Sequence, residues 1–201
     1  MQSLLVVSSV LVWVVVIINI LLTIALVRQF NRVLGQIVPF LGMGMGEKLT
    51  VGEAAPDFKA ETLTGESVTL AHYARKAVSF VFISPHCDPC VEKIPTLTAL
   101  SNQAKQAGVE IVLVNTEGST SETATFVKQH GITLPVLVAP RERNSFANDY
   151  KALMTPSYCL IDQDSHVKET GMFTPGWEDK LAHAWSNASS PQEQRVIVST
   201  T

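Results

Sequence analysis

The start of the chain contains a long apolar segment that few environments can accommodate. Residues 4–27 read LLVVSSVLVWVVVIINILLTIALV, which is 24 consecutive residues without a charged side chain. As a helix, this segment is long enough to cross the roughly 30 Å hydrocarbon layer of a bilayer with some tilt. A cleaved signal peptide would need a basic region before the apolar core, and residues 1–3 contain none. The sequence therefore predicts a transmembrane helix that is retained.

Residues 28–47 are predicted to connect this helix to a folded domain. Apolar side chains recur at spacings of three and four from Phe30 to Leu41, which indicates one apolar helical face. Pro39 and the alternating Gly and Met residues over 42–46 then indicate a flexible joint. The expected organisation is an N-terminal end at 1–3, a transmembrane helix at 4–27, an extension and linker at 28–47, a domain at 48–188 and a tail at 189–201.

Composition limits the remaining possibilities. The chain has 201 residues and 46% hydrophobic content, which is enough to fill one core and too little length for two full domains. The 15 basic residues are scattered against 18 acidic ones, so we expect no nucleic-acid partner. Three cysteines are too few for a disulfide scaffold.

Beyond the linker, strand patterns alternate with helical ones. An apolar run over 77–84, a helical pattern over 90–107 and a second apolar run over 109–115 predict a βαβ unit. A hairpin turning at Thr64 and Gly65 is predicted within 55–70. The other predicted elements are a helix over 122–130, a strand over 134–139, a helix over 144–153, strands over 158–162 and 166–170, and a helix over 177–185. This order predicts an α/β fold.

Two of the cysteines stand at C-x-x-C spacing between the first strand and the helix of that unit. Cys87 would lie at the helix start and Cys90 in its first turn, on one face and close enough for a disulfide. Pro89 suits the first turn because its missing N–H has no helical partner there. The free amides and the dipole at the helix start favour a thiolate at Cys87. The motif therefore predicts a redox pair in which Cys87 attacks and Cys90 resolves the mixed disulfide.

The neighbours of the cysteines are expected to tune this chemistry. The charge of Asp88 disfavours the thiolate and so stabilises the oxidised form, and a protonated His86 offsets it. An inert structural disulfide is disfavoured because closing so short a loop stabilises little. A closed metal site is also disfavoured, since Cys87, Cys90 and His86 supply three ligands and no second C-x-x-C completes the set. We expect neither a metal nor a cofactor.

The motifs resemble a known family. The order strand, C-x-x-C, helix containing Pro95, and later Thr155-Pro156 before a strand is similar to the thioredoxin fold, a central mixed sheet with flanking helices. The phrases VGEAAPDF, FISPHCDPC and TPSYCLIDQD resemble the membrane-tethered redoxins of the TlpA/ResA type. The LW…LVRQ anchor, the VGEAAP opening and the P-Y-x-x-L-I-D strand are most similar to the methylamine-utilisation (MauD-type) accessory thioredoxins. In that family the protein is implicated in forming or correcting disulfides in a partner enzyme during its maturation.

The resemblance implies roles that the spacing alone does not identify. It implies that Pro156 is cis and packs beside the C-x-x-C, with the backbone of Thr155 available to a substrate peptide. We place His86, which precedes the nucleophile, with them as a substrate-binding residue. Redox tuning is assigned to Asp88 and Pro89.

Three positions do not follow the family pattern. His86 stands where thioredoxins often carry a tryptophan, Val81 where thioredoxin carries a buried acid, and Lys93 where ResA-like proteins carry a glutamate. Cys159 follows Pro156 on a predicted central strand, where a cysteine usually behaves as a small buried hydrophobe. We expect Cys159 to take no part in the redox chemistry.

Other functions remain open. The AAPDF opening is shared with peroxiredoxins, although Ser84 stands where that family carries a Thr before its cysteine. Cys87 and Cys90 could instead be soft ligands of a Cu(I)-delivery module. A non-catalytic docking protein is a further alternative.

Two observations give opposite predictions for the side of the membrane on which the domain lies. Arg28 and Arg32 follow the span, which favours a cytoplasmic domain. The resemblance implies an extracytoplasmic, periplasmic domain, where disulfide chemistry is needed, and we prefer this interpretation. The expected partners are a disulfide-containing protein, a membrane, and a membrane or soluble redox donor or acceptor.

Overall fold

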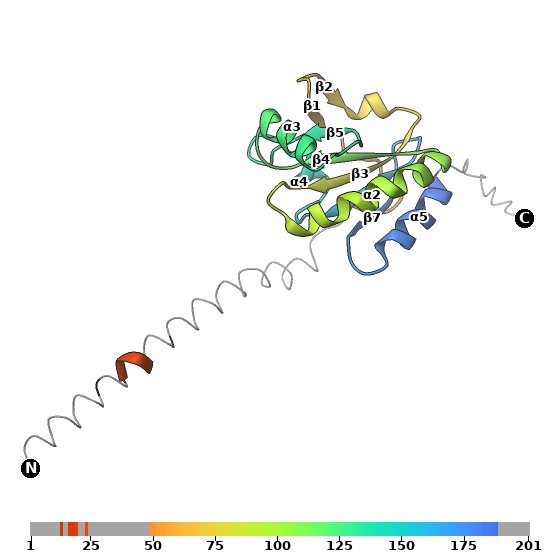
Figure 1. Ribbon diagram of the computed structural model, residues 1–201. Coiled ribbons are helices and arrows are strands. Elements are labelled where there is room, and N and C mark those ends of the chain that lie inside the picture. Colours follow the sequence, from red (N-terminus) through yellow and green to blue (C-terminus); the bar gives the residue numbers. More distant parts are fainter. Residues whose placement is uncertain (1–12, 14–15, 20–22, 24–48, 189–201) are drawn as a thin grey trace, which may run out of the picture. The chain divides into compact units, whose positions relative to one another are not determined.

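The computed structural model describes residues 13, 16–19, 23 and 49–188 of the chain (Figure 1). The chain divides into two compact units, Met1–Glu47 and Lys48–Thr201. In the first unit, the described residues are helical and exposed; Trp13 is 66% and Ile17 53% exposed. Among the described residues, no helix is long and apolar enough to cross a membrane. Most of the predicted transmembrane helix, all of 28–47 and the tail lie outside the described residues.

In the described part of the second unit, seven strands form one mixed sheet in the order β2-β1-β5-β4-β3-β6-β7 (Figure 1). The strands are β1 (Lys59–Thr62), β2 (Ser67–Thr69), β3 (Ala77–Ile83), β4 (Val109–Asn115), β5 (Val136–Val138), β6 (Ser157–Ile161) and β7 (Val167–Met172). The helices are the 3₁₀ helix η2 (Leu70–Tyr73), α2 (Asp88–Gln106), α3 (Thr120–Gln129), α4 (Phe146–Asp149) and α5 (Trp177–Ala188). β3, β4 and β5 are parallel, and the other neighbouring pairs are antiparallel. The predicted α/β order is confirmed.

Three elements have boundaries that differ from the predicted ones, and in each case a single residue explains the difference. α3 begins at Thr120 rather than at 122, because Ser119 caps the helix with its side chain. β5 begins at Val136 rather than at 134, because Pro135 has no N–H to give to a strand ladder. The expected helix over 144–153 was wrong in length, since α4 is a single turn and Lys151 adopts a positive φ of 53°.

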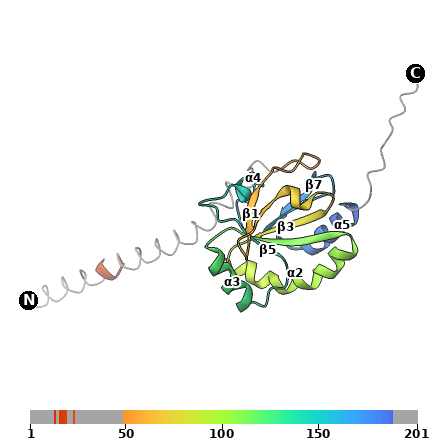
Figure 2. The ribbon, with the colours of Figure 1, turned by 90° about the horizontal axis from the view of Figure 1, so that it is seen from above.

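Helices cover both faces of the sheet (Figure 2). On one face, η2 and α4 enclose a cluster of stacked and edge-to-face aromatic rings: Phe58, Tyr73, Phe80, Phe82, Phe146 and Tyr150. On the other face, α2, α3 and α5 contribute Cys90, Leu97, Phe126, Trp177, Leu181 and Trp185 to a second core. These two clusters form the hydrophobic core of the described domain.

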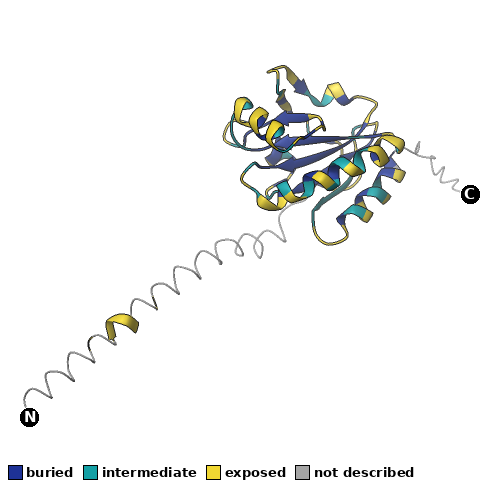
Figure 3. Ribbon diagram, in the orientation of Figure 1, coloured by how far each residue is buried: buried dark blue, intermediate teal, exposed yellow. Residues whose placement is uncertain are grey.

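β3 lies between the two cores, and all seven of its residues are buried (Figure 3). Side chains alternate along a strand, so Phe80 and Phe82 belong to the aromatic cluster while Val81 and Ile83 belong to the α2 side. A strand covered on both faces explains the continuous apolar run that predicted it.

The topology brings several turns to one edge of the sheet. Because β3, β4 and β5 are parallel, their carboxyl ends share that edge, and the turns that follow them lie there. β6 is antiparallel to β3, with Ser157 opposite Phe82, so β6 begins at the same edge. The C-x-x-C motif directly follows β3 and therefore lies among these turns.

Candidate active site

The two cysteines of the motif form a disulfide at the start of α2. Their Cα atoms are 5.2 Å apart, and Cys87 is the N-cap residue of the helix. The Cys87 Sγ accepts a hydrogen bond of 3.2 Å from the backbone N–H of Cys90. Cys87 is half-buried, whereas Cys90 is 0% exposed. An incoming group therefore reaches the sulfur of Cys87 first.

The turn before the helix fixes where Cys87 stands. The backbone N–H of Cys87 donates to the Ser84 carbonyl oxygen at 3.2 Å, and the backbone N–H of His86 donates to Ser84 Oγ at 3.1 Å. The His86 side chain is 83% exposed, and Asp88 and Pro89 are exposed beside it. The predicted substrate-binding residue His86 and the predicted tuning residues Asp88 and Pro89 therefore flank Cys87 at the protein surface.

The structure brings the predicted peptide-binding pair to the disulfide. The Thr155–Pro156 bond is cis, so the isomer implied by the family resemblance is confirmed. The Thr155 carbonyl oxygen lies 3.4 Å from Cys87 Sγ. Thr155 is half-buried and Pro156 is buried. The five residues from His86 to Cys90 and the Thr155–Pro156 pair thus form one site.

Sequence reasoning missed Glu117, which follows β4 at the same edge. Its Oε2 accepts a hydrogen bond of 2.6 Å from Ser84 Oγ and lies 3.2 Å from His86 Nδ1. The Ser84 hydrogen bond holds the pKa of the Glu117 carboxyl below its ordinary value; partial burial opposes this, and His86 and Arg141 add to it. The sequence did contain one indication of this position: a βαβ unit places the ends of its two parallel strands side by side, so a residue after β4 lies near the residues after β3.

A buried amide anchors Glu117. The Asn115 Nδ2 donates to the Glu117 carbonyl oxygen and to Thr123 Oγ1, both at 2.7 Å, and Asn115 Oδ1 accepts from the Glu117 N–H at 3.3 Å. Asn115 is 0% exposed. Its side chain therefore fixes the backbone of Glu117 against α3.

Cys159 lies away from this site. It is 1% exposed and belongs to the aromatic cluster, on the face of the sheet opposite Cys90. Burial raises the pKa of its thiol well above the ordinary value. The expectation of a buried cysteine that behaves as a small hydrophobe is confirmed.

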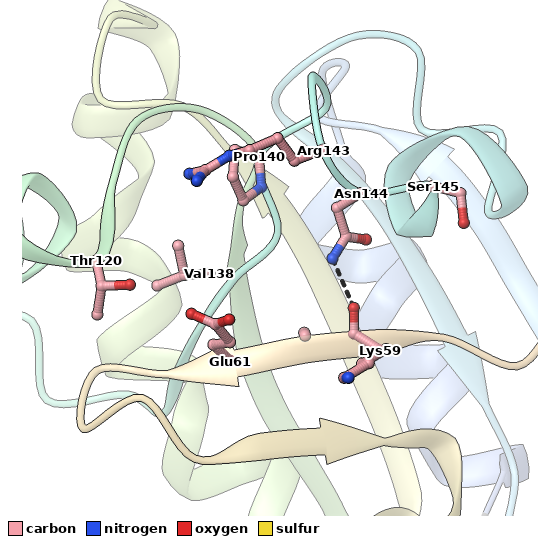
Figure 4. Close-up of a pocket in the computed structure, with 9 residues that line it drawn as sticks. Lys59, Glu61, Thr120, Val138, Pro140, Arg143, Asn144 and Ser145 are labelled. Carbon is pink, nitrogen blue, oxygen red and sulfur yellow. Dashed lines mark hydrogen bonds between the residues drawn. The ribbon is translucent and has the colours of Figure 1, made fainter.

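A hollow of about 460 Å³ lies beside the ends of β1 and β5 (Figure 4). Its charged lining residues are Lys59, Glu61 and Arg143, and Asn144 donates to the Lys59 carbonyl oxygen at 2.6 Å. None of the predicted site residues lines it. Among the described residues, no group of three or more His, Cys, Asp or Glu side chains is arranged to hold a metal ion.

Comparison with known proteins agrees with this geometry. The model of the AhpC/TSA family matches residues 51–170. The thiol-disulfide oxidoreductase ResA of Geobacillus kaustophilus (strain HTA426) is 31% identical over 128 residues, which cover 63% of this chain and 72% of that protein. ResA of Bacillus subtilis (strain 168) is 29% identical over 149 residues, covering 73% of this chain and 80% of that one.

A solved structure has a similar fold. A crystal structure from Chlorobium tepidum, assigned to the thiol:disulfide interchange protein DsbE, superposes with a TM-score of 0.64 at 25% identity. It covers 71% of this chain and 100% of the chain compared. The fold is therefore thioredoxin-like, with a C-x-x-C disulfide at its expected place. The chain belongs to the AhpC/TSA family and is a thiol-disulfide oxidoreductase of the ResA/DsbE type.

Proposed function

We propose that this protein is a membrane-tethered enzyme that forms, reduces or isomerises disulfides in a partner protein during the partner's maturation. Cys87 is the nucleophile in this proposal, and Cys90 is the resolving cysteine. The observation that carries the assignment is the unequal exposure of the two cysteines, since Cys87 is half-buried and Cys90 is 0% exposed. The N-terminal position of Cys87 on α2 supports it, because helix-start amides stabilise a thiolate.

The exchange needs the two cysteines, the substrate, and a redox donor or acceptor that resets the pair. In the reductive direction, the Cys87 thiolate attacks one sulfur of a substrate disulfide and releases the other as a thiolate. Cys90 loses its proton and attacks Cys87 Sγ, which expels the second substrate thiolate and leaves the Cys87–Cys90 disulfide. Two electrons pass to the substrate, and a membrane or soluble thiol donor returns them. The oxidative direction is the reverse, with an acceptor in place of the donor.

The surface around Cys87 is proposed to hold an extended segment of the substrate. The Thr155 carbonyl oxygen beside Cys87 Sγ is a backbone acceptor at the point of attack. His86 is exposed next to Cys87 and offers a ring nitrogen to the substrate. Pro156 is buried and supports the Thr155 backbone.

The membrane tether is proposed from the first unit of the chain. The uncharged run at 4–27 and the exposed apolar side chains of Trp13 and Ile17 support an apolar surrounding for this helix. We place the domain, from about Lys48, on the extracytoplasmic side, as in the MauD-type proteins that the chain resembles. Arg28 and Arg32 argue for the other side, and the reporter experiment in the Discussion decides between them.

The peroxidase alternative is weakened by the position of one hydroxyl. Ser84, at the place where peroxiredoxins carry a Thr, donates its hydroxyl hydrogen to Glu117. A hydroxyl committed to a carboxylate is not free to donate to a peroxide oxygen at Cys87. The site therefore supports thiol–disulfide exchange better than peroxide reduction.

Turnover of a protein disulfide tests the proposal. The full-length protein should accelerate the reduction of insulin by dithiothreitol, and the Cys87→Ser/Cys90→Ser double variant should not. Cys159→Ala is the matched control and should keep full activity, because Cys159 lies on the opposite face of the sheet. Peroxide consumption as fast as insulin reduction, or activity in the double variant, would overturn the proposed function.

A further inference from the structure

The carboxylate of Glu117 is tied to the turn that presents Cys87. One oxygen, Oε2, accepts the Ser84 hydroxyl at 2.6 Å and lies 3.2 Å from the His86 ring nitrogen Nδ1. Ser84 in turn accepts the backbone N–H groups of both His86 and Cys87. A single carboxylate oxygen therefore contacts two of the three residues directly before the nucleophile.

The backbone of Glu117 is held as well. Asn115, fully buried at the end of β4, bonds both the backbone N–H and the backbone carbonyl of Glu117. A further Asn115 bond goes to Thr123 on α3. Parallel pairing of β3 and β4 places Ile83 opposite Asn115, so the two turns leave the sheet side by side. The Glu117 backbone is thus held by Asn115 and its carboxylate by Ser84, in the turn that leads to Cys87.

The charged or ionisable groups that act on Glu117 or on its partner His86 come from three segments. His86 stands on the turn before α2 and Arg141 in the segment after β5, and both interact with the Glu117 carboxylate. Glu122, in the first turn of α3, interacts with His86. Arg141 is occupied by a hydrogen bond to the Ala152 carbonyl oxygen. Glu122 is occupied by the Ser119 cap. Besides Ser84, His86 is therefore the side chain that contacts the Glu117 carboxylate directly.

We propose that Glu117 is a positioning residue that sets the reactivity of Cys87, acting through Ser84 and His86 and making the pair more reducing than it would be without this charge. The proposal rests on the proposed function, because it concerns the same two cysteines. It adds a residue to which neither the C-x-x-C motif nor the peptide-binding pair assigns a role.

The direction of the effect follows from electrostatics. A fixed negative charge near a sulfur destabilises its thiolate, so it raises the pKa of the Cys87 thiol. A less stable thiolate favours loss of electrons, which makes the pair a stronger reductant. When His86 is protonated, its positive charge cancels much of the Glu117 charge, and the effect weakens.

Three variants separate the charge from the hydrogen bonds. Glu117→Gln removes the charge and keeps an acceptor for Ser84, and Glu117→Asp keeps the charge. Glu66→Gln removes one carboxylate from the turn between β1 and β2, outside the site, and is the matched control. The readout is the rate of alkylation of Cys87 by iodoacetamide against pH, measured by mass spectrometry on the reduced full-length protein. The reduced fraction in a glutathione buffer is measured on the same samples.

The alkylation midpoint of Glu117→Gln should fall by about half a pH unit or more, and its reduced fraction at a fixed glutathione ratio should rise. Glu117→Asp and Glu66→Gln should keep the wild-type midpoint. The assignment would be overturned if the alkylation midpoint of Glu117→Gln is unchanged or if Glu66→Gln shifts it equally. It would also be overturned if Glu117→Asp shifts the midpoint as much as Glu117→Gln does. If the wild-type protein does not accelerate insulin reduction, the proposed function fails. If the wild type does so but the alkylation midpoint of Glu117→Gln is unchanged, only the role of Glu117 is contradicted.

Discussion

The Sγ of Cys87 lies 3.4 Å from the carbonyl oxygen of Thr155, a residue 68 positions later in the chain. The contact exists because β6 pairs antiparallel with β3 and begins at the edge where β3 ends. It places the more accessible sulfur beside an accessible backbone acceptor, while Cys90 stays inside the α2 core. The asymmetry between the two cysteines is the basis of the first prediction.

After mild reduction, a short pulse of iodoacetamide should label Cys87 and leave Cys90 and Cys159 unmodified. Cys90 is shielded by burial, and burial also raises the pKa of the Cys159 thiol. Peptide mass spectrometry locates the label. Denaturant should expose all three cysteines, and this serves as the positive control. Labelling of Cys90 before Cys87 in the folded protein would contradict the assigned roles.

Phe146→Ala should lower the free energy of unfolding by about 3–5 kcal/mol, because it removes a fully buried ring from the aromatic cluster. Its ring stacks on Phe58 with centroids 3.8 Å apart. Urea unfolding followed by fluorescence measures the change. Leu153→Ala is the control; Leu153 is 42% exposed, so the change should stay within about 0.5 kcal/mol. A Phe146→Ala protein as stable as the control would show that the cluster is not a core.

Stability should depend on acid through Glu117. The pKa of its carboxyl is lowered in the folded state, so its contribution to stability is present above the unfolded value of about 4.5. That contribution is lost as the pH falls below 4.5 and through the lower folded value. Glu117→Gln should therefore lose less stability than the wild type between about pH 5 and pH 3. Thermal unfolding at several pH values measures this, with Glu66→Gln expected to follow the wild type.

The domain should face the extracytoplasmic side of the membrane. A reporter that is active only after export, fused after Thr201, should give a signal, and a reporter active only in the cytoplasm should give none. Replacing Arg28 and Arg32 with Gln provides a matched variant and should not reduce the export signal. A signal from the cytoplasmic reporter alone would mean that the two arginines determine the orientation.

Local patterns in the sequence predicted much of the fold, and long-range pairing determined the rest. The run at 77–84 and the C-x-x-C that follows it identified β3 and the start of α2, because burial on both faces and helix-start chemistry depend on neighbours in the chain. Glu117 was missed because its role depends on the register of β3 with β4, which no periodicity reveals. Likewise, only the family resemblance suggested that Thr155 would meet Cys87, since their contact depends on the pairing of β6 with β3.

Trapping of the mixed disulfide tests the central claim, that Cys87 attacks and Cys90 resolves, most directly. In cells that make the native partner, Cys90→Ser should accumulate a covalent complex on non-reducing gels, because the second cysteine is no longer present to release it. Cys87→Ser should form no such complex. A reducing agent should cleave the mixed disulfide and release the partner for identification. Complexes in Cys87→Ser but not in Cys90→Ser would reverse the two roles, and complexes in neither variant would contradict disulfide exchange as the function of this site.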